Sequence, residues 1–496
     1  MNGNTIRVNK IDHASLHLSC ERSIEAELQD HFSFYSPGYV FQPKYKYGLW
    51  DGKIRLYNLK TQLLPAGLFH ELIAFAKNNS YQIEIDDTSL PFHISDKVYD
   101  LDIPLYSHGE TITLRDYQLK AVNYAIQNRR CIILSPTGSG KSLNLYALFR
   151  YFKDKKFLLV VPSTSLVEQM YSDFEEYSSL DPSFDVTPET VHRIYSGHDK
   201  NNKSARLMIS TWQSIYQLPK SWFEQFTAVI SDEAHLCKAA SLTKIMNSCV
   251  NASIRVGTTG TLSNDSKVNE MVLKGLFGPI FKATSTKELI DNNTLSQTKI
   301  RVLHVKYQHD LVKEFRKTTK KDYPSEMSYI TQVEKRNKMI THLVSSQKKN
   351  TLVLFNYVES HGKPLYEKIK ASINRPVYYI SGEVAAKDRE EMRATLENEE
   401  NAVLVASVGT FSTGVNLRNL HNIVFASPTK SQIRVLQSLG RGLRKHGENS
   451  LLTVYDIVDD LTLNRYKKNY ALLHGIERMK IYSKEQLEFK LHEITL

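Results

Sequence analysis

The sequence predicts an α/β protein in which two parallel-sheet lobes follow one another, with a small N-terminal α+β domain and a short helical C-terminal region. From Cys131 onward, short apolar runs alternate with segments of helical period, which is typical of parallel strands joined by crossover helices. The runs form two sets that meet near Ser285–Gln297, which indicates two lobes. The N-terminal part differs, because Phe32–Tyr57 is dense in aromatic and turn residues.

Each lobe is expected to contain short strands that are buried on both faces of a sheet, since the runs are short and almost wholly apolar. In the first lobe we predict strands at Cys131–Leu134, Phe157–Val161, Arg206–Ser210, Ala228–Ser231 and Ile254–Thr258. In the second lobe we predict strands at Thr351–Phe355, Val377–Ile380, Ala402–Ala406, Ile423–Ala426 and Leu452–Ile457. The predicted domains span residues 1–98, 99–285, 286–460 and 461–496, the last of them helical and basic.

The bulk composition indicates a soluble globular protein with a polyanionic partner. The chain has 496 residues, of which 41% are hydrophobic and 24% charged, and its net charge is +11. An excess of Lys and Arg over Asp and Glu favours nucleic acid as a partner, although many proteins are basic for solubility alone. None of the 4 cysteines lies in a metal-ligand spacing, which suits free thiols in a reducing compartment. We expect no membrane span and no signal peptide, because no apolar stretch is long enough for either.

The sharpest motif is a phosphate-binding loop that follows an apolar strand and precedes a helical pattern. It reads Ser135-Pro136-Thr137-Gly138-Ser139-Gly140-Lys141-Ser142. Its glycines let backbone N–H groups wrap phosphates at a helix N-terminus, while Lys141 reaches the β- and γ-phosphates and Ser142 places its hydroxyl on Mg²⁺. The general pattern has glycine at the first position, where this chain has Ser135. We assign nucleotide contacts to Thr137, Gly138, Ser139, Gly140, Lys141 and Ser142.

A pair of carboxylates, Asp232 and Glu233, ends the apolar run Ala228–Ser231. Carboxylates at the C-terminal ends of parallel strands face the ligand crevice of an α/β sheet. We expect Asp232 to hold Mg²⁺ and Glu233 to orient and deprotonate the attacking water. The alternative is a capping Asp-Glu pair that opens a helix.

Gln437, Arg441 and Arg444 form the third predicted catalytic element, at the last helical stretch of the second lobe. The two arginines are three residues apart and therefore share one helical face. Guanidinium groups match phosphate oxygens and stabilise a transferring phosphoryl group. Alone, an Arg-x-x-Arg pair is usually a solvated helix face.

Together these elements resemble superfamily 2 helicases of the DEAH-box type, which have two RecA-like lobes and use ATP with Mg²⁺. Further segments match that family in order: Arg115-Asp116-Tyr117-Gln118, Val161-Pro162-Ser163-Thr164, Ser210-Thr211-Trp212-Gln213 and Thr413-Gly414-Val415-Asn416. The resemblance implies adenine recognition by Arg115 and Gln118, strand contacts by Ser163, Thr164 and Thr211, and nucleotide contacts by Gly414 and Asn416. Thr259-Gly260-Thr261 departs from the Ser-Ala-Thr of the family.

A closer resemblance, to the phage UvsW helicases, covers Phe34–Leu68, Lys363–Glu383, Arg444–Gly447 and His474–Arg478. It implies an ATP-dependent DNA helicase of a tailed phage that branch-migrates junctions, regresses stalled forks and unwinds R-loops. It also implies single-stranded and duplex DNA as partners, a place in the host cytoplasm and no membrane, and we favour a monomer.

The candidate duplex contacts of the N-terminal domain are Lys44, Lys46, Lys53 and Arg55. Aromatic residues interleave with them, so that rings could stack on bases while the cations meet phosphates. Alternatively, the period-two alternation Lys44-Tyr45-Lys46-Tyr47 indicates a strand with core tyrosines and solvated lysines. Two further basic clusters are more often solvated helix faces: Arg465, Lys467, Lys468, Arg478 and Lys480, and Lys313, Arg316, Lys317, Lys320 and Lys321.

Two rival functions remain open from the sequence. An RNA helicase or the translocase subunit of a restriction system would carry the same nucleotide motifs. A protein of another class would bind or anneal nucleic acid and use ATP only to switch its affinity.

Overall fold

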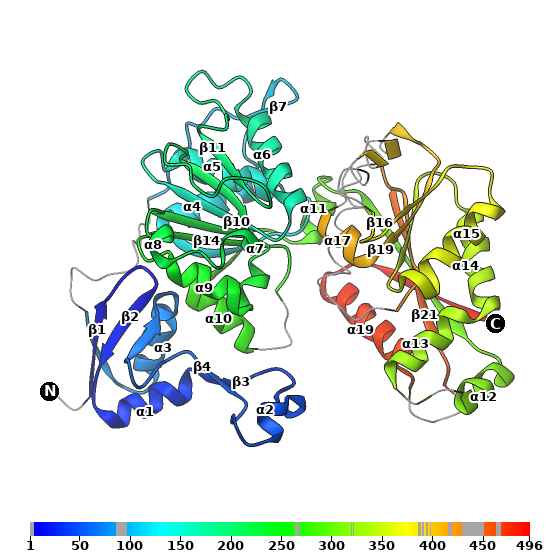
Figure 1. Cartoon of the computed structure of the whole chain (residues 1–496), viewed down its shortest axis with the longest axis horizontal. Helices are drawn as coiled ribbons and strands as arrows, with labels where there is room; N and C mark the ends of the chain where they lie inside the picture. The colour runs from blue at the N-terminus through cyan, green and yellow to red at the C-terminus, as the bar shows by residue number, and fades with distance from the viewer. Residues whose placement is uncertain are drawn as a thin grey trace. The chain divides into compact units, whose positions relative to one another are not determined.

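The computed structural model describes residues 4–85, 97–262, 267–318, 320, 322–384, 388, 391–392, 395–396, 398–414, 419–428, 451–462 and 468–496. The chain divides into two compact units (Figure 1). The first comprises residues 1–135 and 140–283, and the second comprises residues 284–496 with the loop segment Pro136–Ser139. Each unit is described by itself.

The N-terminal domain is a four-stranded sheet in the order β5-β2-β1-β6, on which two helices pack. Its elements are β1 (Thr5–Lys10), β2 (Ser15–Ser19), α1 (Arg22–His31), β5 (Leu63–Pro65), η2 (Ala66–Leu68), α3 (Phe69–Asn78) and β6 (Gln82–Ile85). An arm, residues 33–55, leaves this sheet between α1 and β5 (Figure 1). The arm contains β3 (Ser33–Tyr35), η1 (Tyr39–Phe41), α2 (Pro43–Lys46) and β4 (Lys53–Arg55), and β3 pairs with β4.

The N-terminal domain is fixed to the first lobe by close packing. A side chain at Gly67 would place its Cβ 2.0 Å from the carbonyl oxygen of Lys274, so only glycine allows this approach. The Lys274 Nζ donates to Glu71 Oε1 at 2.7 Å. The buried Arg130 donates from Nη1 to the carbonyl of His13 at 2.8 Å. The N-terminal domain and the first lobe therefore pack directly against each other.

The first lobe is a seven-stranded parallel sheet in the order β11-β12-β10-β13-β14-β9-β15. Its elements are β7 (Tyr106–Ser107), β8 (Glu110–Thr111), α4 (Asp116–Asn128), β9 (Arg130–Leu134), α5 (Lys141–Tyr151), β10 (Phe157–Val161), α6 (Thr164–Ser178), β11 (Val191–Ile194), β12 (Leu207–Thr211), α7 (Trp212–Ile215), α8 (Lys220–Phe223), β13 (Ala228–Asp232), η4 (Ala234–Lys238), α9 (Ala240–Ser248), β14 (Ile254–Thr259), α10 (Lys267–Phe277) and β15 (Ile280–Lys282). Two hydrophobic cores flank this sheet, because successive side chains of a strand point to its opposite faces. Cys131 and Ile133 pack in one core with residues of α4, α5 and α6, and Ile132 packs in the other with α9 and α10.

The second lobe repeats this plan with a parallel sheet in the order β18-β19-β17-β20-β21-β16-β22. Its described elements are α11 (Thr286–Asp291), β16 (Gln297–Lys306), α12 (His309–Thr318), α13 (Tyr323–Gln332), α14 (Glu334–Ser346), β17 (Thr351–Phe355), η5 (Val358–Gly362), α15 (Lys363–Ser372), β18 (Val377–Ile380), β19 (Val403–Ser407), α17 (Val408–Gly414), β20 (Asn422–Phe425), β21 (Leu451–Asp460), α19 (Tyr470–Lys484) and β22 (Phe489–Thr495). None of the helices in the described part of the chain combines the length and apolar character that a membrane span requires.

The two parallel-sheet lobes confirm the predicted fold class, and three strands, β10, β17 and β18, lie at the predicted residues. The remaining predicted strands differ at their ends. Four strands of the two seven-stranded sheets were not predicted: β11, β15, β16 and β22. The short pair β7 and β8 was not predicted either. The C-terminal region is helical over α19 as expected, but it then adds β22 to the second sheet.

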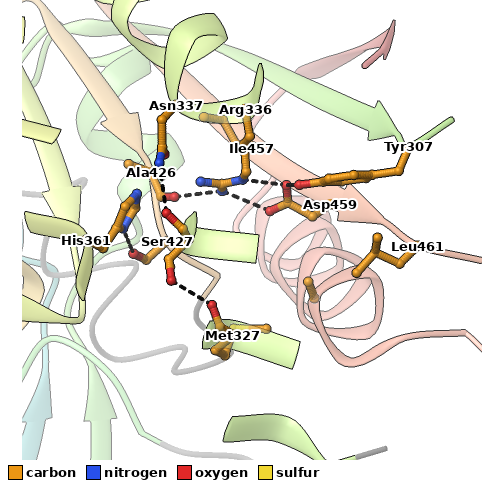
Figure 2. A network of polar contacts seen from close by, with 12 residues as sticks. Tyr307, Met327, Arg336, Asn337, His361, Ala426, Ser427, Ile457, Asp459 and Leu461 are labelled. Atoms are coloured by element: carbon orange, nitrogen blue, oxygen red, sulfur yellow. Dashed lines mark hydrogen bonds and ion pairs between the residues drawn. The ribbon is translucent and has the colours of Figure 1, made fainter. Parts of the chain in front are cut away.

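The core of the second lobe contains a buried ion pair that joins several elements (Figure 2). Arg336 of α14 donates to both carboxylate oxygens of Asp459 at 2.7 and 2.9 Å and to the carbonyl of Ala426 at 2.8 Å. The hydroxyl of Tyr307 donates to the same carboxylate at 2.8 Å. The side chains of Arg336 and Asp459 are both 0% exposed, so the pair connects α14, β20 and β21 in a site without water access.

A second buried pair corrects one expectation. Arg478, predicted as part of a basic surface cluster, is 0% exposed and donates to the carboxylate of Asp456 at 2.7 Å. Tyr482 donates to the same carboxylate at 2.8 Å. The charge of Arg478 therefore serves to attach α19 to β21, and the surface prediction for this residue was wrong.

Asp459→Ala should lower the free energy of unfolding of the second lobe by about 3–5 kcal/mol, because it leaves the Arg336 guanidinium buried without its carboxylate. Urea unfolding measures this change. The control is Glu477→Ala, which removes an exposed ion pair with Lys480 at 2.7 Å and should leave the unfolding midpoint nearly unchanged. Equal midpoints for the two variants would contradict a structural role of the buried pair.

Candidate nucleotide site and nucleic-acid contacts

The phosphate loop connects β9 to α5, as the sequence predicts, and its glycines have the backbone conformation that the motif requires. Gly138 and Gly140 have φ angles of +85° and +81°, a region that other residues rarely adopt. A Cβ at Gly140 would lie 2.4 Å from Nε2 of Gln118. Helix α5 begins at Lys141, so its N-terminal N–H groups point into the loop, where an anion binds favourably.

Two predicted side chains of the loop lie at the start of α5. The Lys141 Nζ donates to the carbonyl of Ser135 at 3.4 Å, across the base of the loop. The Ser142 hydroxyl lies 3.0 Å from the hydroxyl of Tyr177, a partner on α6 that the sequence did not indicate. Within the loop, Ser139 donates to the carbonyl of Pro136 at 2.7 Å.

Asp232 ends the central strand β13 and is only 5% exposed. Burial raises the pKa of its carboxyl above the usual range, and the adjacent Glu233 raises this pKa further. The positive charge of Lys141 and a hydrogen bond from Thr258 Oγ1 at 2.7 Å act in the opposite direction. Lys141 and Asp232 are thus close enough to interact electrostatically, as the predicted site requires.

The oxygen donors predicted for the metal suit Mg²⁺. Asp232 supplies a carboxylate and Ser142 a hydroxyl, which are the hard oxygen donors that Mg²⁺ prefers. Within the described residues, no group of three or more His, Cys, Asp or Glu side chains is placed to hold a metal ion. A cation with so few protein ligands completes its coordination with water and nucleotide phosphates, as Mg²⁺ commonly does. A divalent charge would also offset the burial that raises the pKa of Asp232.

Glu233 follows β13 with a φ of +52°, a strained value for a residue with a side chain. One of its carboxylate oxygens lies 3.2 Å from Nδ1 of His235. The same nitrogen lies 3.0 Å from Oγ1 of Thr259, whose own proton goes to the carbonyl of Thr261 at 2.9 Å. His235 Nδ1 is therefore the donor in its contact with Thr259.

This chain of contacts connects the Asp232-Glu233 pair to the Thr259-Gly260-Thr261 segment. His235 follows the Asp232-Glu233 pair by two residues and Thr259 begins the Thr259-Gly260-Thr261 segment, but the sequence gave no sign that these two side chains meet. The departure from Ser-Ala-Thr keeps a hydroxyl at the first position, and that hydroxyl makes the contact with His235.

Gln118 and Arg115, predicted to read adenine, lie at the start of α4. Gln118 is 2% exposed, and its Oε1 accepts a hydrogen bond from the backbone N–H of Arg115 at 2.9 Å. Since Gln118 also lies against Gly140, it connects the start of α4 to the phosphate loop. The guanidinium of Arg115 is exposed and donates to the Tyr117 hydroxyl at 3.3 Å.

The three predicted strand contacts in the first lobe have different surroundings. Ser163 caps α6, because its hydroxyl accepts from the N–H of Leu166 at 3.4 Å. Thr164 is exposed. Thr211 is 4% exposed and its hydroxyl lies 2.9 Å from that of Ser214, so Thr164 is the best placed of the three side chains to meet a ligand.

Lys44 and Lys46 do not lie on a strand, so the predicted strand with core tyrosines was wrong. Residues Pro43–Lys46 form the short helix α2, with the proline at its first turn. Lys53 lies 3.7 Å from Asp30, and Arg55 pairs with Asp51. Lys44 and Lys46 are exposed and have no ion-pair partner within the described residues.

The structure does not test the contribution of the second lobe to this site. Gln437, Arg441, Arg444 and Asn416 lie outside the described residues. Gly414 ends the short helix α17, which follows β19.

The chain matches three family models that together span both lobes and the N-terminal domain. They are DNA helicase UvsW, N-terminal, over residues 5–86, Type III restriction enzyme, res subunit, over residues 111–264, and Helicase conserved C-terminal domain over residues 334–446. Two of these matches cover strands β9–β14 and β17–β20 of the lobes, and the third covers the N-terminal sheet.

Similar proteins extend the match to the full length. The chain is 36% identical over 513 residues to the ATP-dependent DNA helicase uvsW of Enterobacteria phage T4, an alignment that covers 99% of this chain and 100% of that protein. The crystal structure of T4 UvsW matches with a TM-score of 0.52 and 35% identity over 99% of both chains. The Type ISP restriction-modification enzyme LlaBIII bound to DNA matches with a TM-score of 0.57 over 84% of this chain and 34% of its own, but at 16% identity it supports the fold alone. With 36% identity over its full length and the phosphate loop and Asp232-Glu233 pair in place in its first lobe, the chain belongs to the UvsW family of ATP-dependent DNA helicases.

Proposed function

We propose that the chain hydrolyses ATP with Mg²⁺ to remodel branched DNA, by branch migration, fork regression and R-loop unwinding. The observation that carries this proposal is that Lys141, at the end of the phosphate loop, acts electrostatically on the buried Asp232, in a chain similar over its whole length to a DNA helicase. We also propose that it works as a monomer in the host cytoplasm.

Each residue of the site has a distinct task in this proposal. The N–H groups of the phosphate loop bind the phosphates, and the Lys141 ammonium exchanges the Ser135 carbonyl for the β- and γ-phosphate oxygens. Ser142 and Asp232 hold Mg²⁺, which neutralises charge on the phosphates when bound. Glu233 accepts the proton of the attacking water.

The contacts of His235 support a route from hydrolysis to movement. His235 lies between the Glu233 carboxylate and the Thr259 hydroxyl at the end of β14. A change of charge or hydration at Glu233 therefore alters a hydrogen bond to the segment that follows β14. In our proposal this contact couples the nucleotide state to the DNA-binding surface.

The second lobe is proposed to supply Arg441 and Arg444, with Gln437, to the phosphates, and Gly414 and Asn416 to the nucleotide. Arginine charge stabilises a phosphoryl group most in the transition state. Arg115 and Gln118 are proposed to recognise adenine, because Gln118 already lies against the loop at Gly140.

The DNA contacts are proposed on both parts of the first unit. Ser163, Thr164 and Thr211 lie at the C-terminal ends of β10 and β12, the edge at which ligands bind to parallel sheets. On the arm, Lys44 and Lys46 are the cations most available to phosphates, while Lys53 and Arg55 would first have to leave acidic partners.

Lys141→Ala should abolish ATP turnover while leaving DNA affinity largely intact, because the lysine faces the phosphates rather than the strand. ATP turnover and DNA anisotropy, measured on the same preparation, give the two results. The matched control is Lys153→Ala, which changes an exposed lysine just after α5 and should turn over ATP normally. Normal stimulated turnover by Lys141→Ala would refute the assignment of the nucleotide site.

Glu233→Gln should slow hydrolysis by about 100-fold or more but still allow ATP to bind, since an amide cannot accept the proton of the water. Rapid-quench measurement should then find uncleaved ATP retained on the protein–DNA complex. Glu224→Gln changes an exposed carboxylate of the same lobe and should hydrolyse ATP at the normal rate. An unchanged kcat for Glu233→Gln would exclude this residue as the base.

A further inference from the structure

The arm of the N-terminal domain ends in large apolar side chains that face solvent. Residues 39–49, which we call the tip, contain Phe41, Tyr47 and Leu49, and each of these side chains is 78% exposed. Among the described residues, no other large apolar side chain is more exposed than these three. Exposed apolar groups gathered on one short turn indicate a surface that meets a partner.

The tip is folded without using these three side chains. Tyr39 stacks on Tyr35 with ring centres 4.6 Å apart and meets Tyr45 edge-on at 4.8 Å. The backbone at Gly52 closes under Tyr39, where a Cβ would lie 2.4 Å from the ring. Trp50 Nε1 donates to the carbonyl of Lys53 at 2.9 Å. Some aromatic residues of the arm thus form a small core inside it, whereas Phe41 and Tyr47 face solvent.

The charge of the tip favours nucleic acid as its partner. Lys44 and Lys46 are exposed and residues 39–49 contain no acid, while the nearby Asp51 is paired with Arg55. Lysine is depleted in protein–protein interfaces, whereas aromatic rings beside cations suit bases and phosphates. A hollow of about 420 Å³ at the base of the arm adds Lys53 and Lys267, and Asp30 is the acid among its described lining residues.

The arm is also mounted on the part of the protein that binds ATP. The N-terminal domain packs on α10 through Gly67 and is held by the Lys274–Glu71 and Arg130–His13 contacts. At the root of the arm, the ring centre of Phe34 lies 5.8 Å from Nζ of Lys267, the first residue of α10. An element fixed in this way keeps its position relative to the first lobe while DNA is moved past it.

We propose that Phe41, Tyr47 and Leu49 form an apolar wedge that enters the duplex at the branch point and stacks on the bases where the strands separate. Apolar side chains that insert between base steps unstack them, and the lysines beside them hold the phosphates. This inference rests on the proposed DNA-remodelling function and deepens it, because it names the residues that meet the junction.

The test is the triple variant Phe41→Ala, Tyr47→Ala, Leu49→Ala in the full-length chain. It should keep the single-strand-stimulated ATP turnover of the unchanged protein but unwind a forked duplex about tenfold more slowly, a loss of the size expected for lost base stacking. A 2-aminopurine base at the branch should brighten when the unchanged protein binds without ATP, and stay dark with the triple variant. Leu180→Ala, which changes a 57% exposed leucine of the first lobe, is the control and should behave like the unchanged protein.

The outcomes separate this inference from the function on which it rests. If the unchanged protein does not unwind forks, the proposed function fails. If it does and the triple variant unwinds them equally well, the wedge is refuted and the function stands. A triple variant that loses ATP turnover in the same proportion as unwinding would also refute the wedge. The wedge would likewise be refuted if sedimentation showed that the triple variant no longer self-associates while its unwinding is unchanged. In that case the tip would bind a second copy of the chain.

Discussion

A carboxylate that is almost completely buried sets the requirements for the rest of the nucleotide site. Asp232 is 5% exposed at the end of β13 and has a second carboxylate, Glu233, beside it. Two like charges in a buried place are unfavourable unless cations and hydrogen bonds compensate. Lys141 and the Thr258 hydroxyl supply part of this compensation, and a divalent cation would supply more.

The order of the sheet explains why these groups meet. Strands β13, β14 and β9 are neighbours, and their parallel register sets Asp232 opposite Thr258 and Thr259 opposite Leu134. The residues after three strands are therefore brought to one edge, which is the ligand-binding edge of a parallel sheet. Across the same edge, His235 connects Glu233 to Thr259. In our account, the sheet thus binds the nucleotide and also transmits its state.

Patterns within short stretches of sequence predicted those strands and site residues whose properties depend on their immediate neighbours in the chain. The apolar runs indicated β10, β17 and β18 correctly. Strands β10 and β17 are buried along their whole length, whereas β18 lies at the edge of its sheet and is mostly only partly buried. Strands β16 and β22 were missed because charged and polar residues interrupt their apolar pattern. The Lys44–Tyr47 alternation suggested a strand, whereas the proline at the start of α2 favours a helical turn there.

The glycine loop and the Asp-Glu pair carry their chemistry within a few residues and could be recognised, but the contacts with Tyr177, Thr258 and Thr259 join distant segments. Only the fold reveals such partners.

The central claim is that ATP hydrolysis at this site drives strand separation in branched DNA. The most direct test follows ATP turnover and strand displacement together on single strands, forks, four-way junctions and R-loops, with matched RNA strands as a comparison. The account predicts ATP-dependent conversion of the branched DNA substrates, and no conversion without hydrolysis. ATP turnover stimulated by DNA with no strand displacement on any branched substrate would contradict it, and would favour a translocase that moves on DNA without separating its strands.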